Sequence, residues 1–413
     1  MPDRVVLAYS GGLDTSVCLY WLREEYGYEV HTLTLDLGAQ PDLEAARQRA
    51  KAAGVAEPLI VDAREEFLRD FVFPALKANA RYEGQYPLAT ALSRPLIARH
   101  LVEAAIARGA SAVAHGCTGK GNDQVRFDVS VAALAPQLKV IAPVRDKGGK
   151  LTREEELELL QAHGLDFPMR KSSPYSTDEN LWGRSIEAGA LEDAWLQPPE
   201  DAYLWTKPIE ATPNEPRFIE VGFEEGLPVR LDGEVVSALA LVTELNRLAG
   251  EHGTGRIDHI ENRLVGIKSR EVYEAPAATV LLTAHEALEA LTLSKEQMRF
   301  KASVAQQYAD LVYNGLWFTA HREDLQAYVD STQRYVTGTV RVRLHKGNAT
   351  VVGRRSPYAL YQESLATYSA GDTYDHAAAA GFIRIWGLPV RTQTQQQRKG
   401  RQNPPSSSGR GSG

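Results

Sequence analysis

Near its start the chain carries a glycine turn whose residue types suit a phosphate-rich anion. Residues 8–16 read Ala-Tyr-Ser-Gly-Gly-Leu-Asp-Thr-Ser and follow the apolar run Val5-Val6-Leu7. The run predicts a buried strand, and apolar residues recur at helical spacing after the turn. A turn from strand to helix directs backbone N–H groups and the positive end of the helix dipole at one point. Gly11 and Gly12 permit close approach of the backbone, so a pyrophosphate fits this turn.

The order of residues in this turn differs from that of the usual phosphate-binding loop. That loop ends in Gly-Lys-Ser or Gly-Lys-Thr, whereas here no lysine follows and Asp14 lies inside the turn. The segment Ser10–Ser16 resembles instead the pyrophosphate loop of ATP pyrophosphatases, which cleave ATP between the α and β phosphates and form an adenylate. A structural glycine turn without a ligand is the alternative interpretation.

A second stretch rich in polar residues follows another predicted strand. Residues 115–127 read His-Gly-Cys-Thr-Gly-Lys-Gly-Asn-Asp-Gln-Val-Arg-Phe. A turn needs fewer glycines and polar side chains than this, so the density favours a nucleotide or substrate site over a solvated loop, which is the alternative. Arg126 can hold a carboxylate in a bidentate fork, and Asp123 can accept a hydrogen bond from an amine.

Alternating strands and helices must position both stretches. We expect strands at 5–7, 29–36, 58–62, 112–115 and 139–142, and helices at 65–80 and 94–108. Repeated strand–helix units predict a doubly wound parallel sheet with helices on both faces. Ligands of such sheets bind outside the carboxyl ends of the strands. The glycine turn, the loop after Asp36 and the loop after His115 lie at such ends, so we expect them to converge.

The pattern changes after about Pro168. Residues 170–235 contain irregular proline-rich stretches, and the expected helices and hairpin that follow lie at 236–250, 284–313, 322–335 and around Lys346-Gly347-Asn348. The fold class is α/β, with a first domain at 1–168 and an α+β domain at 169–392. Residues 393–413 are rich in Gln, Ser, Pro, Gly and basic residues, and we predict a disordered tail there.

Composition bounds the class of protein. The chain has 413 residues, 43% hydrophobic and 24% charged, with a net charge of −7, which predicts two or three domains and argues against broad nucleic-acid binding. Cys18 and Cys117 form neither a disulfide framework nor a metal pair, and a cytoplasmic location is expected. No apolar run reaches the length of a membrane span, and we expect no signal peptide, membrane partner or dedicated metal site.

Five segments of the chain together resemble argininosuccinate synthase. They are the glycine turn, 115–127, 81–86, 174–181 and 255–263, in register from about residue 4 to about residue 390. The resemblance implies an adenine-nucleotide α-hydrolase-like first domain and a synthetase and oligomerisation domain after it. It implies an AMP-forming ligase that joins citrulline to aspartate through a citrullyl-adenylate, releases pyrophosphate and serves arginine biosynthesis. It also implies a homotetramer.

The resemblance assigns residues to each substrate. ATP is expected to meet Ala8, Tyr9, Ser10, Gly11, Gly12, Leu13, Asp14, Thr15, Ser16, Leu35 and Gly116. Aspartate is expected at Thr118, Asn122 and Asp123. Citrulline is expected at Tyr86, Asn122, Arg126, Ser176, Ser185, Glu261 and Tyr273. Asp14 and Asp123 are the candidate catalytic residues, and Mg²⁺ is expected to accompany ATP.

Structural roles remain open for several of these residues. Tyr86 and Tyr273 can be core aromatics with satisfied hydroxyl groups. Ser176 can cap a helix. Glu261 can be a surface acid paired with Arg263. The role of Asp14, whether it contacts the ion or orders the loop, is open, as is the base for the aspartate amine.

Two places depart from the family pattern. Ala91 stands where the family usually has serine, so either citrulline binds more weakly or the hydroxyl of Thr90 or Ser93 compensates. Residues 38–40 read Gly-Ala-Gln rather than Gly-Gln-Gly, and Leu35 replaces a smaller residue. These changes leave the contacts to the adenine base open.

The alternative function is that of another adenylating enzyme with a pyrophosphate loop, such as a tRNA-modifying sulfurtransferase or lysidine synthetase. Sulfur transfer usually needs a catalytic cysteine pair, and this chain has no Cys-x-x-Cys. RNA binding requires a basic face, and the C-terminal stretch is the one basic part without acids. A glutamine-dependent amidotransferase needs a glutaminase nucleophile, whereas Pro2 follows Met1. A non-enzymatic ATP-binding protein leaves the second domain's motifs unexplained.

Overall fold

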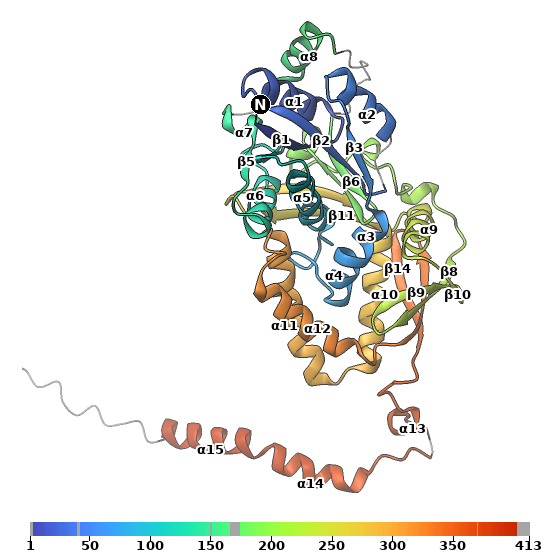
Figure 1. Ribbon diagram of the computed structural model, residues 1–413. Coiled ribbons are helices and arrows are strands. Elements are labelled where there is room, and N and C mark those ends of the chain that lie inside the picture. Colours follow the sequence, from blue (N-terminus) through green and yellow to red (C-terminus); the bar gives the residue numbers. More distant parts are fainter. Residues whose placement is uncertain (1–2, 39–41, 149–150, 166–173, 370, 403–413) are drawn as a thin grey trace, which may run out of the picture. The chain divides into compact units, whose positions relative to one another are not determined.

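A five-stranded parallel sheet, ordered β3-β2-β1-β4-β5, organises the N-terminal part of the chain in this computed structural model (Figure 1). Its strands are β1 (Arg4–Ala8), β2 (Glu29–Asp36), β3 (Leu59–Asp62), β4 (Ala112–Ala114) and β5 (Lys139–Ile141). The structure describes residues 3–38, 42–148, 151–165, 174–369 and 371–402. The predicted boundary at residues 168 and 169 lies outside them.

Helices cover both faces of this sheet because its strands are apolar on both sides. Val5 and Leu7 pack with α1 and α2, while Val6 packs in a second cluster with α5 and α6. The first face carries α1 (Leu13–Glu24), α2 (Leu43–Ala52), α7 (Pro143–Asp146) and α8 (Arg153–Ala162). On the second face α5 (Ala89–Ala107) packs against β1, β2 and β4, and α6 (Asp123–Leu134) packs against α5. Between β3 and α5 the chain forms α3 (Arg64–Phe67), the π-helical turn η1 (Leu68–Val72) and α4 (Phe73–Lys77), and α4 contacts α10 (Pro276–Thr292) and α12 (Ala320–Gln333). The prediction of a doubly wound sheet is confirmed.

Two antiparallel sheets follow. One has the order β11-β12-β7-β6 and the other β10-β9-β8-β13-β14. Their strands are β6 (Ser176–Asn180), β7 (Gly183–Glu187), β8 (Arg217–Glu224), β9 (Leu227–Leu231), β10 (Glu234–Val235), β11 (Arg256–Asn262), β12 (Lys268–Glu274), β13 (Gly338–His345) and β14 (Asn348–Arg355). The 3₁₀ turns η2 (Gly189–Glu192), η3 (Glu200–Ala202) and η4 (Ile209–Ala211) connect them.

The proline-rich stretches expected at 197–199 and 212–216 do lie outside the strands, but the strands β6 to β10 in the same segment were not predicted. Strands β6 and β7 read Ser-Thr-Asp-Glu-Asn and Gly-Arg-Ser-Ile-Glu, so they lack the apolar alternation that marks a strand. Pairing of β7 with β12 and of β6 with β7, rather than local pattern, fixes their positions. The hairpin of β13 and β14 is confirmed, with Val340, Val342 and Leu344 buried on one face.

Four longer helices complete residues 1–360, which form one of two compact units. They are α9 (Ala238–Glu251), α10 (Pro276–Thr292), α11 (Lys295–Tyr313) and α12 (Ala320–Gln333). The single helix expected at 284–313 is two, because Ser294 and Gln297 form a capping box that starts α11. None of the helices in the described ranges combines the length and the apolar character required to cross a membrane.

The second compact unit, residues 361–413, contains α13 (Glu363–Ala366), α14 (His376–Trp386) and α15 (Leu388–Gln402). The disordered tail predicted from Gln393 is wrong for residues 393–402, which are helical. Gln, Arg and Lys are good helix formers, and Pro389 lies near the helix start, where proline is tolerated. Residues 403–413 lie outside the described residues.

Candidate active site

Hydrogen bonds from its own side chains fix the glycine turn between β1 and α1. The hydroxyl of Ser16 donates to the carbonyl oxygen of Gly12 at 2.9 Å, and Thr15 Oγ1 donates to the same oxygen at 3.2 Å. Gly11 has a φ of +76°, and a Cβ there would lie 2.5 Å from the Cβ of Ala46 in α2. Within the described chain no side chain caps α1. The first backbone N–H groups of this helix therefore suit an anion.

The loop after β4 starts against this turn. A Cβ at Gly116 would lie 3.3 Å from Thr15 Cγ2 in α1. The predicted meeting of these two loops is thus confirmed, and the hydroxyl of Thr34 in β2 adds a link by donating to the carbonyl oxygen of Tyr9 at 2.6 Å. In the loop after Asp36, residues 39–41 lie outside the described residues.

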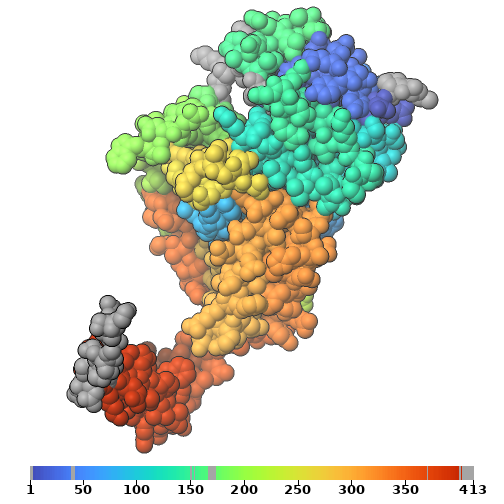
Figure 2. All heavy atoms as spheres, turned by 90° about the vertical axis from the view of Figure 1, so that its left-hand side faces the viewer, coloured from blue at the N-terminus to red at the C-terminus, as the bar shows by residue number. Residues whose placement is uncertain are grey.

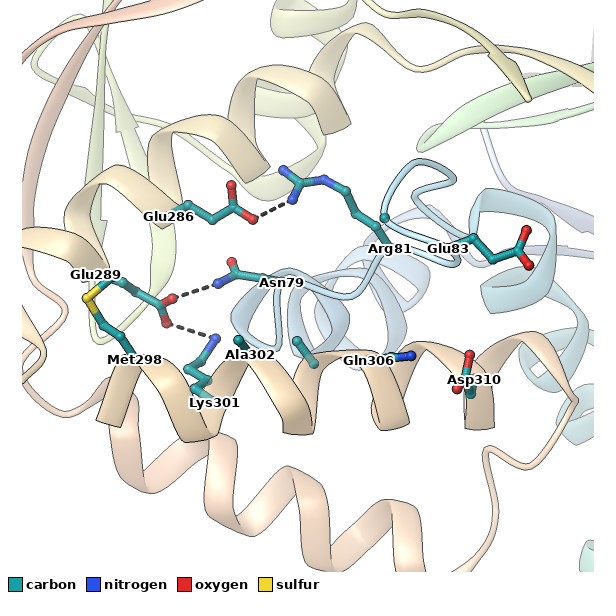
Figure 3. Close-up of a pocket in the computed structure, with 12 residues that line it drawn as sticks. Asn79, Arg81, Glu83, Glu286, Glu289, Met298, Lys301, Ala302, Gln306 and Asp310 are labelled. Carbon is teal, nitrogen blue, oxygen red and sulfur yellow. Dashed lines mark hydrogen bonds and ion pairs between the residues drawn. The ribbon is translucent and has the colours of Figure 1, made fainter. Parts of the chain in front are cut away.

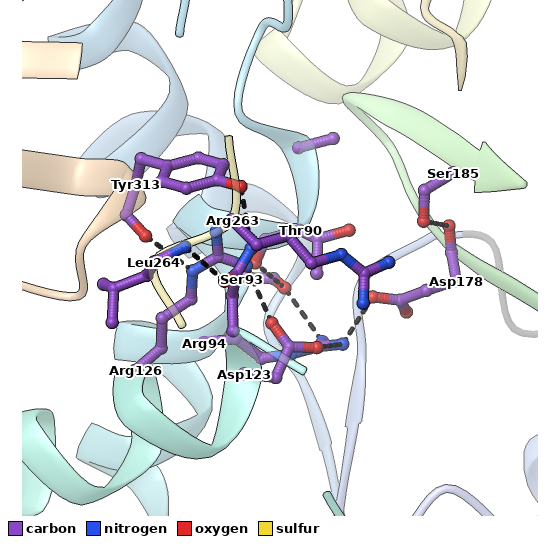
Figure 4. A network of polar contacts seen from close by, with 12 residues as sticks. Thr90, Ser93, Arg94, Asp123, Arg126, Asp178, Ser185, Arg263, Leu264 and Tyr313 are labelled. Atoms are coloured by element: carbon purple, nitrogen blue, oxygen red, sulfur yellow. Dashed lines mark hydrogen bonds and ion pairs between the residues drawn. The ribbon is translucent and has the colours of Figure 1, made fainter. Parts of the chain in front are cut away.

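The end of the β4 loop contributes to a pocket of about 110 Å³ between α5, α6 and the sheet β11-β12-β7-β6. Figure 4 labels several residues of its lining within a network of polar contacts. The full lining consists of Tyr86, Thr90, Gly121, Asn122, Asp123, Arg126, Asp178, Ser185, Glu187, Glu261, Arg263, Glu271 and Tyr273. Every residue predicted for citrulline except Ser176 is in this lining, together with Asn122 and Asp123 of the aspartate set. On the surface, segments from α6, from β11 and β12 and from α11 adjoin one another, in teal, yellow and orange (Figure 2).

Arg126 of α6 is 3% exposed and is held at two of its three nitrogens. Its Nη1 donates to Asp123 Oδ1 at 2.8 Å, and its Nε donates to the carbonyl oxygen of Tyr313 at 2.9 Å. Its Nη2 is buried and has no hydrogen-bond partner in the described part of the chain. A buried donor without a partner is costly, so this nitrogen suits an acceptor oxygen of a ligand.

Asp123 lies between two guanidinium groups. Its Oδ2 accepts from Arg94 Nη2 at 2.8 Å, and Arg94 also forms an ion pair with Asp178 of β6 (Figure 4). Burial alone would raise the pKa of Asp123, but the positive charges of Arg94 and Arg126 outweigh burial and lower that pKa. Asp123 is therefore a carboxylate suited to an ammonium group, and a poor proton acceptor.

Glu261 of β11 is buried and is held by two tyrosines. Tyr273 OH donates to its Oε2 at 2.6 Å, and Tyr313 OH donates to its Oε1 at 2.5 Å. Burial is the main cause that raises the pKa of both tyrosines, so both hydroxyl groups stay protonated donors. A carboxylate has about four lone-pair sites, so Glu261 keeps capacity for a ligand's ammonium group.

Arg263 and two glutamates form another wall of the pocket. Arg263 makes ion pairs with Glu187 and Glu271, and its Nε donates to Ser269 Oγ at 2.7 Å. The alternative pairing of Arg263 with Glu261 is thereby wrong. Burial raises the pKa of Glu187 and of Glu271, and the neighbouring Glu271 charge adds to the effect on Glu187.

The residues predicted for ATP lie outside this pocket lining, as do Ser176 and Thr118 of the amino-acid sets. Ser176 is exposed and starts β6, where it pairs with Glu187; its alternative role as a helix cap is wrong because a strand follows. Thr118 lies in the loop before α6. Leu35 is 4% exposed and packs in the core from β2, so its side chain is directed into the protein.

The two tyrosines with an open structural alternative are packed against each other and also line the pocket. Tyr86 and Tyr273 stack with ring centroids 4.3 Å apart, and both line the pocket. The backbone N–H of Thr90 donates to Tyr86 OH at 2.9 Å. Thr90 also lines the pocket, whereas Ala91 is fully buried inside α5. Of the two compensating hydroxyl groups considered, the structure favours that of Thr90.

Sequence reasoning missed Arg94, Asp178 and Tyr313. A signal existed for Arg94, which is the one charged residue among residues 89–98 of α5. Asp178 lies in 174–181, a segment of the family resemblance, but the resemblance assigned it no role. Tyr313 gave no local signal, because its contacts to Asn122 and Glu261 join residues 191 and 52 positions away.

A larger cavity of about 540 Å³ lies between α10, α11 and the segment around Arg81 (Figure 3). It contains none of the predicted site residues. Charged residues of its lining pair with each other: the buried Lys301 with the buried Glu289 at 2.9 Å, and the more exposed Arg81 with Glu286. Size alone therefore does not make it the better candidate.

Comparison with known proteins gives two family matches that together span most of the chain. Residues 4–166 match the model described as the argininosuccinate synthase N-terminal HUP domain. Residues 175–393 match the model of the argininosuccinate synthase C-terminal domain.

Curated relatives match over nearly their full length. A protein named argininosuccinate synthase from Dehalococcoides mccartyi (strain BAV1) is 55% identical, over 96% of this chain and 97% of its own. The protein of that name from Gloeobacter violaceus is 59% identical, over 95% and 98%. That from Thermosynechococcus vestitus is 57% identical, over 96% and 99%.

Proposed function

The chain belongs to the argininosuccinate synthase family, and we propose that it joins L-citrulline to L-aspartate while cleaving ATP to AMP and pyrophosphate. The observation that carries the proposal is that Arg126, Glu261 and Asp123 line one pocket. The loop after β4 leads into this pocket, and its start lies against the glycine turn. Family membership argues against the alternative sulfurtransferase and lysidine synthetase functions.

The glycine turn is our proposed site for the phosphates of ATP. The uncapped start of α1 offers backbone N–H groups and a positive dipole end to the two outer phosphates. Mg²⁺ is expected to enter as part of the nucleotide substrate. Among the described residues no group of three or more His, Cys, Asp or Glu is arranged to hold a metal ion. Asp14, in the first turn of α1, is the residue we propose to face that ion.

The two amino acids would bind through their charged groups. For citrulline, the unpartnered Nη2 of Arg126 suits the α-carboxylate and Glu261 suits the α-ammonium. For aspartate, Asp123 suits the ammonium, with Thr118 as a further partner, and Asn122 would contact both amino acids. Opposite charges separated within one small pocket favour zwitterionic ligands held in one orientation, which supports catalysis by positioning.

The proposed reaction has two steps. The ureido oxygen of citrulline attacks the α-phosphorus of ATP, the bond to the β-phosphate oxygen breaks, and pyrophosphate leaves with that electron pair. The aspartate amine, after losing a proton, then attacks the ureido carbon, and AMP leaves with the former ureido oxygen. Donors at the glycine turn would stabilise the charge that develops on pyrophosphate.

Exchange of labelled pyrophosphate into ATP tests this function. We expect exchange that requires citrulline and proceeds without aspartate, because the first step alone returns label to ATP. Net release of AMP should require both amino acids. Exchange driven by tRNA, or no exchange with citrulline, would contradict the proposal.

The hydroxyl of Thr90 is expected to support citrulline binding in place of the missing one at position 91. Thr90→Val should raise the KM for citrulline about fivefold, since one neutral hydrogen bond contributes about 1 kcal/mol. Ala91→Ser is the matched variant, and we expect it to leave that KM unchanged because Ala91 is fully buried. Initial rates at varied citrulline concentration measure the KM of both variants. An unchanged KM for Thr90→Val together with a lower KM for Ala91→Ser would contradict the role of Thr90.

We propose a homotetramer in which α14 contributes to the contacts between subunits. Phe382, Ile383, Ile385 and Trp386 of this helix are between 60% and 75% exposed, a large apolar content for a surface helix. The double variant Phe382→Asp, Trp386→Asp should form smaller species by light scattering. Gln396→Asp in α15 is the control and should stay tetrameric. A wild-type monomer would contradict the tetramer, and a tetrameric double variant would exclude α14.

A further inference from the structure

Tyr313, the last residue of α11, is fully buried and contacts residues from three other parts of the chain. Its hydroxyl donates to Glu261 in β11, and it accepts from Asn122 Nδ2 at the start of α6 at 2.8 Å. Its carbonyl oxygen accepts from Arg126. Tyr313 does not itself belong to the pocket lining, so it acts on the pocket through these neighbours.

The hydrogen bonds around this hydroxyl run in one direction. The backbone N–H of Leu264 donates to Asn122 Oδ1 at 2.9 Å, which fixes the amide so that its Nδ2 faces Tyr313. Tyr313 then donates its own proton to Glu261 Oε1. A hydroxyl has one donor and can accept as well, so both functions are used. The hydroxyl oxygen of Tyr313 thereby links Asn122, which is next to Asp123 at the start of α6, to Glu261 in β11.

We propose that Tyr313 is a positioning residue that couples the citrulline and aspartate sites. This inference rests on the proposed function, in which Glu261 binds the citrulline ammonium and Asn122 contacts both amino acids. Loss of the hydroxyl releases the Glu261 carboxylate from one of its two tyrosine donors and leaves the Asn122 amide held by Leu264 without its second partner. Both amino-acid sites are then loosened by one change, while the glycine turn is untouched.

The ring of Tyr313 has a separate role, so the hydroxyl can be tested alone. The ring stacks on Tyr82 with centroids 3.5 Å apart and planes 4° apart. The guanidinium carbon of Arg126 lies 4.8 Å from the ring centroid. Phenylalanine keeps the stack, the cation–π contact and the backbone carbonyl, and it removes only the link between Asn122 and Glu261.

Tyr313→Phe is expected to raise the KM for citrulline about tenfold, because it removes a hydrogen bond to the charged Glu261. It should raise the KM for aspartate about fivefold, because it removes a hydrogen bond with the neutral Asn122 amide. The KM for ATP should change less than twofold. Tyr308→Phe is the matched control, since Tyr308 lies on the same helix, is equally buried and donates one hydrogen bond, to Gln326 at 2.7 Å. A merely structural loss would affect both variants and all three substrates alike.

A second variant keeps the inference testable if Tyr313→Phe folds poorly. Tyr82→Leu removes the half-exposed ring that stacks on Tyr313. It should raise the KM values for citrulline and aspartate by a smaller factor than Tyr313→Phe does. Wild-type protein without citrulline-dependent pyrophosphate exchange would overturn the proposed function itself. Wild-type exchange together with unchanged citrulline and aspartate KM values in the folded Tyr313→Phe variant would overturn only the role of Tyr313.

Discussion

Arg126→Lys is expected to lower kcat/KM for citrulline by about 10²–10³-fold, within the range of about 2–5 kcal/mol for losing one partner of a buried, hydrogen-bonded charge pair on binding. The guanidinium bonds Asp123 and the Tyr313 carbonyl at once and keeps Nη2 for the ligand. Lysine has the charge but a single nitrogen, so it cannot meet three acceptors in fixed directions. Initial rates of pyrophosphate release at varied citrulline measure the loss.

Arg322→Lys provides a matched control for this substitution. Arg322 in α12 also donates through Nε to a backbone carbonyl, that of Trp317 at 2.8 Å, and lies 4.5 Å from an aromatic ring centroid. It lines no part of the pocket. We expect its kcat/KM to stay within about twofold of wild type. Equal losses in both variants would show that arginine packing, rather than a role in the pocket, explains the effect.

Gly11→Ala is expected to reduce pyrophosphate exchange at least about 100-fold. A shift of about 1 Å in the position of a reacting group can by itself lower the rate by that factor, even when the mutation is far from the reacting atoms. Gly11 has φ +76°, and an added Cβ would lie 2.5 Å from the Cβ and 2.9 Å from the Cα of Ala46. The backbone of α2 cannot yield as a flexible side chain would, so the turn must move. The N–H groups that it directs at the phosphates move with it.

Gly27→Ala separates this effect from backbone strain. Gly27 has φ +73°, and an added Cβ there meets nothing within 4 Å. A left-handed conformation costs an alanine about 1–2 kcal/mol, so thermal unfolding should show a loss of stability in both variants. Exchange should fall in Gly11→Ala alone. Normal exchange by a folded Gly11→Ala protein would remove the glycine turn from the proposed mechanism.

The parallel half of the fold was predictable because its signals are local. Val5-Val6-Leu7 is apolar on both sides, and the glycine turn and the capping box of Thr152 and Glu155 mark where helices begin. The strands β6, β7, β11 and β12 were not predicted, because polar and charged residues of these strands face the pocket. Glu187, Glu261 and Glu271 disrupt the alternation that would have revealed the strands.

The candidate site was predictable only as far as its residues share a motif. Asn122, Asp123 and Arg126 stand together in one segment, and the family resemblance added Tyr86, Ser185, Glu261 and Tyr273. Arg94 and Tyr313 became visible only in three dimensions. Each acts by satisfying another side chain, Asp123 in one case and Glu261 in the other. Such pairings across long sequence separations have no local pattern.

The hydrogen bond from Arg126 to the Tyr313 carbonyl spans 187 positions of the chain, and this separation bears on how the protein matures during synthesis. A ribosome-bound chain can complete the parallel sheet long before α11 has been made. Its nucleotide turn can then form while the amino-acid pocket still lacks a wall. Fragments truncated before α11 should therefore have no measurable affinity for citrulline, however well their parallel sheet is formed.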